Sequence, residues 1–143
     1  MPPSHFKFSF HNAWHMPIEQ VEWLPELQLL EVRSGIGAGP RHRIPERRWK
    51  AFWKKMQAMG IWVWPEDFVR LEDEMICDGW GWDMEIQHAG LRLKTGGINT
   101  YPPDEDGRNS GNGNRGETRT FQKLRAAIRA LHAGTEVVGG HQP

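Results

Sequence analysis

The sequence predicts an α+β fold: a two-layer sandwich with a mainly antiparallel sheet of about four to five strands and two helices on one face. Three patterns lead to this prediction. Three phenylalanines within residues 6–10 alternate with polar residues, as in a strand with one buried face. Residues 82–95 alternate in the same way on both sides of an Ala-Gly turn, which predicts a β-hairpin. Two segments, 45–59 and 118–132, carry apolar residues at helical spacing.

The expected elements follow one another along the chain with short connections between adjacent strands. They are a strand at 5–12, a strand at 26–34, a helix at 45–59, the hairpin at 82–95 and a helix at 118–132. Residues 13–25 contain two prolines and are predicted to be a connection, whereas 61–65 are predicted to be a short strand or an extended loop. Acidic and basic side chains of the hairpin are expected to pair across its solvated face, Asp83 and Glu85 with Arg92 and Lys94.

A chain of 143 residues corresponds to about one domain. We expect that domain to cover residues 1–134. Within it, residues 104–119 are rich in Gly and Asn and hold no apolar side chain, so they are predicted to be a flexible loop. Residues 135–143 are predicted to be a disordered tail.

Charge and hydropathy argue against two classes of partner. Lys and Arg total 18 and Asp and Glu total 18, so no net positive charge attracts nucleic acid. The basic run at 41–50 is interpreted as a solvated loop and helix start. No apolar run reaches the roughly 20 residues of a membrane span, and the N-terminus shows no signal-peptide pattern. We therefore expect a cytoplasmic protein with neither a nucleic acid nor a membrane as partner.

No cofactor or metal is expected from the motifs. The glycines at 35–39 lack the Lys-Ser/Thr of a phosphate-binding P-loop and the spacing of a dinucleotide fingerprint. Cys77 is the only cysteine, which excludes an intramolecular disulfide and a multi-cysteine zinc site. His5, His11 and His15 do not form a ligand set, because their predicted positions in a strand and a loop do not converge.

The tryptophans mark the candidate site, since the chain holds eight Trp and one Tyr. The segments that enter and leave the hairpin, 77–82 and 96–102, should lie side by side at one end of the strand pair. Side chains from both segments would then converge there, namely Asp78, Trp80, Trp82, Asn99 and Tyr101. They would form either a pocket with aromatic walls and polar groups or a corner of capped turns and core rings. Trp62 and Trp64 are further candidates for a binding surface.

Several short motifs resemble those of an uncharacterised domain of small bacterial proteins. The motifs are Asp78-Gly79-x-x-Trp82, Gly97-x-Asn99-x-Tyr101-Pro102 and Phe121-x-x-Leu124, with Trp49-x-x-Phe52 and Trp62-x-Trp64 upstream. The resemblance covers about residues 45–132. It implies an α+β fold and no known activity, so it transfers no catalytic residue. The loop at 104–119 is longer than the resemblance implies.

The function expected from these features is a non-catalytic binding or protein-interaction module of a bacterial protein. Exposed aromatic side chains would anchor a protein or a small molecule, drawn from Trp14, Trp23, Trp62, Trp64 and Trp80. One alternative is a hydrolase-like small-molecule enzyme with its site at the end of the 82–95 hairpin. Another is a self-association module that forms a homodimer, encoded as cargo of a mobile gene cassette.

Overall fold

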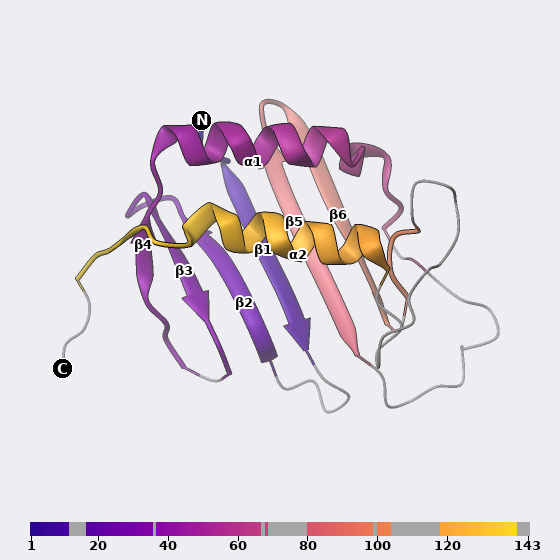
Figure 1. Cartoon of the computed structure of the whole chain (residues 1–143), viewed down its shortest axis with the longest axis horizontal. Helices are drawn as coiled ribbons and strands as arrows, with labels where there is room; N and C mark the ends of the chain where they lie inside the picture. The colour runs from indigo at the N-terminus through magenta and orange to yellow at the C-terminus, as the bar shows by residue number, and fades with distance from the viewer. Residues whose placement is uncertain are drawn as a thin grey trace.

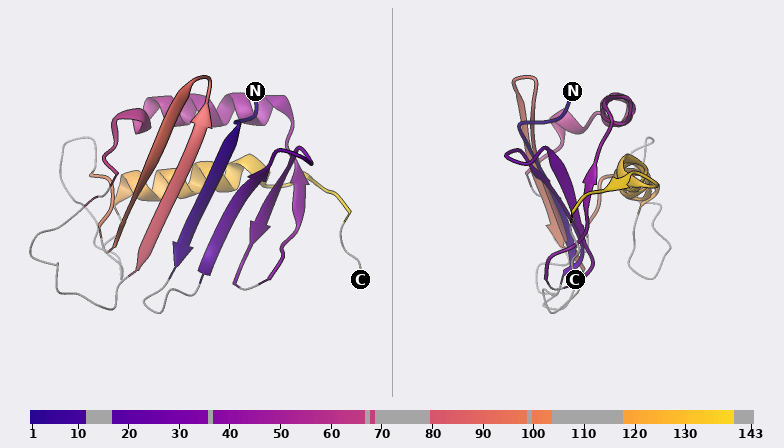
Figure 2. Two further views of the ribbon diagram at one scale, coloured as in Figure 1. Left: turned by 180° about the vertical axis from the view of Figure 1, so that it is seen from behind. Right: turned by 90° about the vertical axis from the view of Figure 1, so that its left-hand side faces the viewer.

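The computed structural model describes residues 1–11, 17–35, 37–66, 68, 80–98, 100–103 and 118–139. These residues form one antiparallel sheet in the order β6-β5-β1-β2-β3-β4-β7 (Figure 1). The strands are β1 His5–His11, β2 Pro17–Leu24, β3 Leu29–Arg33, β4 Arg41–Arg43, β5 Gly81–His88, β6 Leu91–Ile98 and β7 Glu136–Val137. Helices α1 (Glu46–Ala58) and α2 (Arg119–His132) lie on the same side of the sheet (Figure 2).

The predicted α+β class is confirmed, but the predicted number of strands is wrong, because the described residues alone form seven. Residues 13–25 were expected to be a connection, whereas Pro17–Leu24 form β2. A proline is tolerated as the first residue of a strand, and Pro25 lies just beyond the last one. The basic residues Arg41–Arg43 form β4 and not a loop, pairing with β3 and β7. The predicted disordered tail likewise includes a strand, Glu136–Val137.

Side chains on the covered face of the sheet make most of the core. They alternate along β1 and β5 with polar residues, and each is almost completely buried: Phe6, Phe8, Phe10, Trp82, Met84 and Ile86. The hairpin of β5 and β6 is confirmed, with Ala89 and Gly90 at its turn. Only one of the expected acidic–basic pairs lies opposite in the strand register, and its Lys94 forms an ion pair with Glu66 at 3.8 Å. Glu85 lies opposite Lys94, but Asp83 lies opposite Gly96 and Arg92 opposite Gln87.

Both predicted helices are confirmed, and each buries one apolar face against the sheet. The buried residues are Trp49, Phe52 and Met56 in α1 and Phe121, Leu124, Ala127, Ile128 and Leu131 in α2. Gly60 and Gly134 follow the helices with positive φ, as helix-ending glycines commonly do. The hydroxyl of Thr118 caps α2 by accepting from the Phe121 amide at 3.1 Å, and it donates to the Pro102 carbonyl at 2.6 Å.

The segment after α1 differs from the prediction of a strand or extended loop. Ile61–Val63 form a single 3₁₀ turn, η1, because Gly60 adopts a left-handed conformation and turns the chain back toward the sheet. The next residues run beside the edge strand β6. There the Phe68 amide donates to the Gly96 carbonyl at 2.9 Å, and the Thr95 hydroxyl donates to the Pro65 carbonyl at 2.7 Å. Residues 104–117 of the predicted loop lie outside the described residues.

Candidate functional site

The structure brings together three of the residues predicted at the end of the hairpin. Trp82 and Tyr101 are 2% and 3% exposed, and their rings lie 5.1 and 4.6 Å from the ring of Phe121. The Trp82 indole nitrogen donates to the Thr100 carbonyl at 2.8 Å. Trp80 is half-buried and stacks on Phe10 with the ring centres 5.6 Å apart. Aromatic rings therefore fill this corner, while Asp78 and Asn99 lie outside the described residues.

The remaining predicted tryptophans have different surroundings. Trp23 is 4% exposed and packs edge-on against Trp49, so the expectation that it anchors a partner from the surface is wrong. Trp62 and Trp64 are half-buried and lie against the core. Trp64 also contacts Trp82 edge-on, with ring centres 6.4 Å apart. Trp14 lies outside the described residues.

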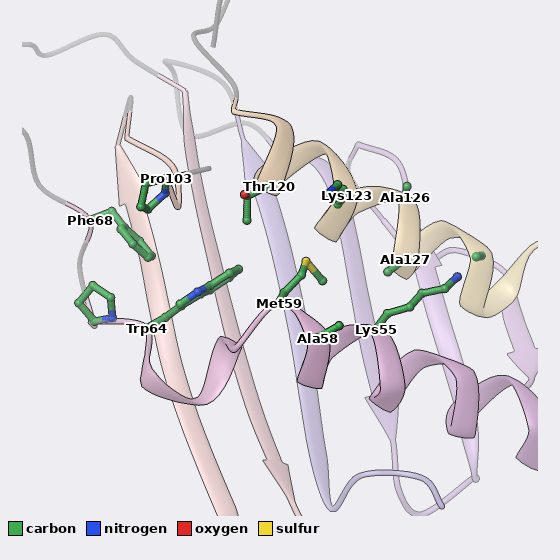
Figure 3. A pocket seen from close by; sticks show the side chains of 12 residues that line it. Lys55, Ala58, Met59, Trp64, Phe68, Pro103, Thr120, Lys123, Ala126 and Ala127 are labelled. Atoms are coloured by element: carbon green, nitrogen blue, oxygen red, sulfur yellow. The ribbon is translucent and has the colours of Figure 1, made fainter. Parts of the chain in front are cut away.

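A groove of about 830 Å³ runs between the C-terminal half of α1, the segment after η1 and the exposed side of α2 (Figure 3). Its described lining is mostly apolar. The lining residues are Lys55, Ala58, Met59, Trp64, Pro65, Phe68, Pro103, Thr120, Lys123, Ala126, Ala127 and Ala130. Small-molecule sites are typically about 300–1,000 Å³, apolar, and carry a few polar groups. The groove has the size and the composition of such a site.

Small side chains leave this space open between the two helices. α2 presents Ala126, Ala127 and Ala130 to the groove, and α1 presents Ala58. These methyl groups leave open the space that larger side chains would fill. Trp64 closes one side of the groove, and its ring extends toward Met59 in Figure 3.

The wall that carries Trp64 and Phe68 is attached to the core and to the edge of the sheet. Phe68 packs on Trp64 edge-on at 5.8 Å and stacks on the buried Trp82 at 6.0 Å. The backbone hydrogen bond from Phe68 to β6 holds the same residue at the sheet edge. These contacts fix the two aromatic side chains against the core and leave one side of each in the groove.

Two lysines are among the described residues that line the groove. Lys55 from α1 and Lys123 from α2 are both exposed and line it from opposite helices. Thr120 adds a hydroxyl group from the first turn of α2. The described lining residues include no acidic side chain.

Sequence reasoning found only Trp64 among the residues that line this groove. The local signal that could have indicated the groove is the group of alanines on α2, which leaves one helical face without large side chains. Trp80, Trp82 and Tyr101 were correctly expected to lie together, but on rings of the core and not around an open site.

The described part of the chain contains no group of three or more His, Cys, Asp or Glu side chains placed to hold a metal ion. None of its helices combines the length and the apolar character needed to cross a membrane.

Comparisons with protein-family models, with curated proteins and with solved structures gave no match for this chain. The resemblance to an uncharacterised bacterial domain is therefore a prediction still to be tested.

Two histidines lie side by side where the end of α2 meets strand β4. The rings of His42 and His132 are 5.2 Å apart, and His42 Nδ1 lies 3.0 Å from the Thr135 hydroxyl. Burial lowers the pKa of both imidazoles. For His132, the neighbouring His42, Arg129 and Arg48 lower the pKa further, whereas Glu19 raises it. Burial also lowers the pKa of His88, which stacks on Trp53.

These pKa shifts predict that the folded protein loses stability in mild acid. The unfolded chain takes up protons at its ordinary histidine pKa of about 6.5, before the folded protein does. The free energy of unfolding should therefore fall as the pH drops below about 6.5, by at most about 1.4 kcal/mol per pH unit for each group. Burial raises the pKa of Asp83. This shift has the opposite effect on the free energy of unfolding, but at lower pH, near the ordinary pKa of a carboxyl group.

Urea unfolding at pH 7.5, 6.5 and 5.5 measures this loss. The variant with both His42→Gln and His132→Gln should show a smaller decrease across the same pH range. A free energy of unfolding that stays constant or rises between pH 6.5 and 5.5 would exclude the assigned direction of the histidine shifts.

Proposed function

We propose that this protein is a non-catalytic binding module that holds a small apolar molecule in the groove between α1 and α2. The observation that carries the proposal is a groove of about 830 Å³ whose described lining is apolar apart from two lysines and one threonine. The ligand lies against Trp64 and Phe68, which both pack on the buried Trp82. Burial of their remaining exposed apolar surface supplies the main favourable term, about 25 cal/mol per Å² of apolar area.

Filling the groove should weaken the binding of an uncharged apolar probe. Ala126 is exposed on α2 and lines the groove, so Ala126→Trp places an indole in the ligand's space and leaves the core unchanged. Nile red, which becomes fluorescent in apolar surroundings, should bind this variant at least about tenfold more weakly than the unchanged protein.

The matched control is Gln122→Trp, because Gln122 is an exposed residue of the same helix that does not line the groove. This control adds the same side chain elsewhere on α2, and it should bind Nile red as the unchanged protein does. Equal affinity in the unchanged protein and in Ala126→Trp would show that the probe binds elsewhere, and would refute the proposed function.

The proposal retains the expected class of function and changes the anchoring residues. Aromatic anchoring now involves Trp64 and Phe68, with Trp62 and Trp80 outside the groove lining. A bacterial source, a cytoplasmic location and the absence of a nucleic-acid partner remain predictions. So do the alternatives of a hydrolase-like enzyme and a self-associating module.

A further inference from the structure

The zero net charge, which argued against a nucleic-acid partner, is the sum of two oppositely charged parts of the chain. The two helices hold nine of its 18 Lys and Arg residues and one of its 18 Asp and Glu residues, so their formal charge is +8. The other nine basic and 17 acidic residues give the rest of the chain −8. Both helices lie on the same side of the sheet (Figure 2), so the helical layer is strongly basic.

The outward face of α1 carries a basic stripe made of Arg47, Lys50 and Lys54. All three residues are exposed, and their spacing of three and four positions places them side by side along the helix, opposite its buried face. No other described residue forms an ion pair or a hydrogen bond with their side chains. Glu46 is the single acidic residue of α1, and its carboxylate is bound by the N-terminal ammonium group. The charge of the stripe is therefore left for a partner.

The basic stripe does not help the helix to form. Arg47 stands in the first turn of α1, where the helix dipole favours an acidic side chain. Lys50 and Lys54 are one turn apart, a spacing at which like charges repel each other. Local choices that cost stability without a structural return are typical of functional surfaces.

The composition of this face indicates the class of partner. Beside the stripe α1 exposes Ala51, Gln57 and Ala58, whereas its half-buried Trp53 is stacked on His88 of the hairpin. A helix that lies on a membrane needs bulky apolar residues, and protein interfaces concentrate their affinity in buried aromatic anchors. Single-stranded nucleic acid is bound largely by stacking of bases on aromatic rings. Binding to the phosphates of a duplex needs positive charge alone.

We propose that the outward face of α1 binds the phosphate backbone of duplex nucleic acid without reading its sequence. The stripe spans about 10 Å of helix, which is comparable to three base-pair steps of about 3.4 Å each. The open face of the sheet is less suitable because it mixes charges, with Lys7 between Glu22 and Glu85 in the strand register. This proposal replaces the expectation drawn from net charge, and it does not depend on the groove.

The salt dependence of binding tests the proposal. Fluorescence anisotropy of a labelled DNA duplex of about 20 base pairs is measured with the whole protein between about 20 and 200 mM salt. Three phosphate contacts should give a slope of about −2.7 when the logarithm of the association constant is plotted against the logarithm of the salt concentration. Affinity then falls about 40-fold for each fourfold rise in salt. A duplex of unrelated sequence should bind equally well.

Removing one charge of the stripe should remove about one phosphate contact. Lys50→Gln and Lys54→Gln should each reduce the slope by about 0.9, and the combined variant should reduce it by about 1.8. The matched control is Arg92→Gln, which removes an exposed positive charge from β6 and should leave the slope unchanged. The midpoint of thermal unfolding should not fall in the combined variant, because the changes relieve repulsion within α1.

Three results would overturn the proposal. One is the absence of duplex binding at about 20 mM salt, or binding that does not weaken as salt is added. Another is a slope that is the same in the unchanged protein and in the combined variant, or that Arg92→Gln reduces as much as a stripe variant does. The third is tighter binding of polyglutamate or of phosphatidylglycerol vesicles than of the duplex, which would assign the stripe to an acidic protein or to a membrane. Nile red binding in the groove should be the same in all these variants.

Discussion

Replacing Phe121 with alanine should lower the free energy of unfolding by about 3–5 kcal/mol, the largest effect that we expect from a single substitution. Phe121 is completely buried at the start of α2. Its ring lies within 6.4 Å, centre to centre, of four other aromatic rings, those of Phe8, Phe10, Trp82 and Tyr101. Alanine would leave a cavity that these large, fixed rings cannot close.

Chemical denaturation of Phe121→Ala and of Gln122→Ala measures this effect. Gln122 is exposed on the next position of α2, so its replacement should change the free energy of unfolding by no more than about 0.5 kcal/mol. A loss below about 1 kcal/mol in Phe121→Ala would mean that the aromatic cluster does not support the sheet end where the hairpin and α2 meet.

Replacing Glu19 with glutamine should cost about 2–3 kcal/mol. Glu19 lies on β2, and its carboxylate is 3.1 Å from Arg125 Nη2 and 3.8 Å from Arg129 Nε. The side chains of Glu19 and Arg125 are only 15% and 13% exposed, and the Arg125 guanidinium lies 4.5 Å from the centre of the Phe10 ring. Removing one charge of a buried pair costs about 3–5 kcal/mol, and partial exposure reduces that figure here.

A double-mutant cycle distinguishes pairing from a general effect of substitution. Glu19→Gln, Arg125→Met and the combined variant are unfolded in urea, and their losses are compared. The combined loss should be smaller than the sum of the single losses by at least about 1 kcal/mol, because the second change removes the buried charge that the first leaves behind. Additive losses would show that the two residues act independently.

The elements that the sequence predicted correctly are those with a regular apolar pattern. Phe6, Phe8 and Phe10 alternate strictly, and the two helices repeat their apolar residues every three or four positions. β2 was missed because Pro17 and Pro25 outweighed the apolar Val21 and Trp23. β4 and β7 are very short and carry no apolar pattern, and neighbouring strands pair with them.

The candidate site was less predictable than the fold. Trp80, Trp82 and Tyr101 were placed together because a hairpin brings its two ends side by side, but local patterns do not tell core rings from pocket rings. The groove depends on how closely α1 and α2 approach across the sheet. The distance between the two helices is a property of tertiary packing. Small residues such as Ala126 and Ala127 therefore indicate a groove only when the facing helix is known.

Intermolecular nuclear Overhauser effects between 1-decanol and the protein would locate the bound ligand. A ligand in the groove should give contacts from its hydrocarbon protons to the Trp64 ring and to the methyl groups of Met59 and Ala126, and these contacts should vanish in Ala126→Trp. Contacts confined to another apolar surface, such as the one lined by Leu27, Leu29 and Val137, would contradict the assignment of the binding site to this groove.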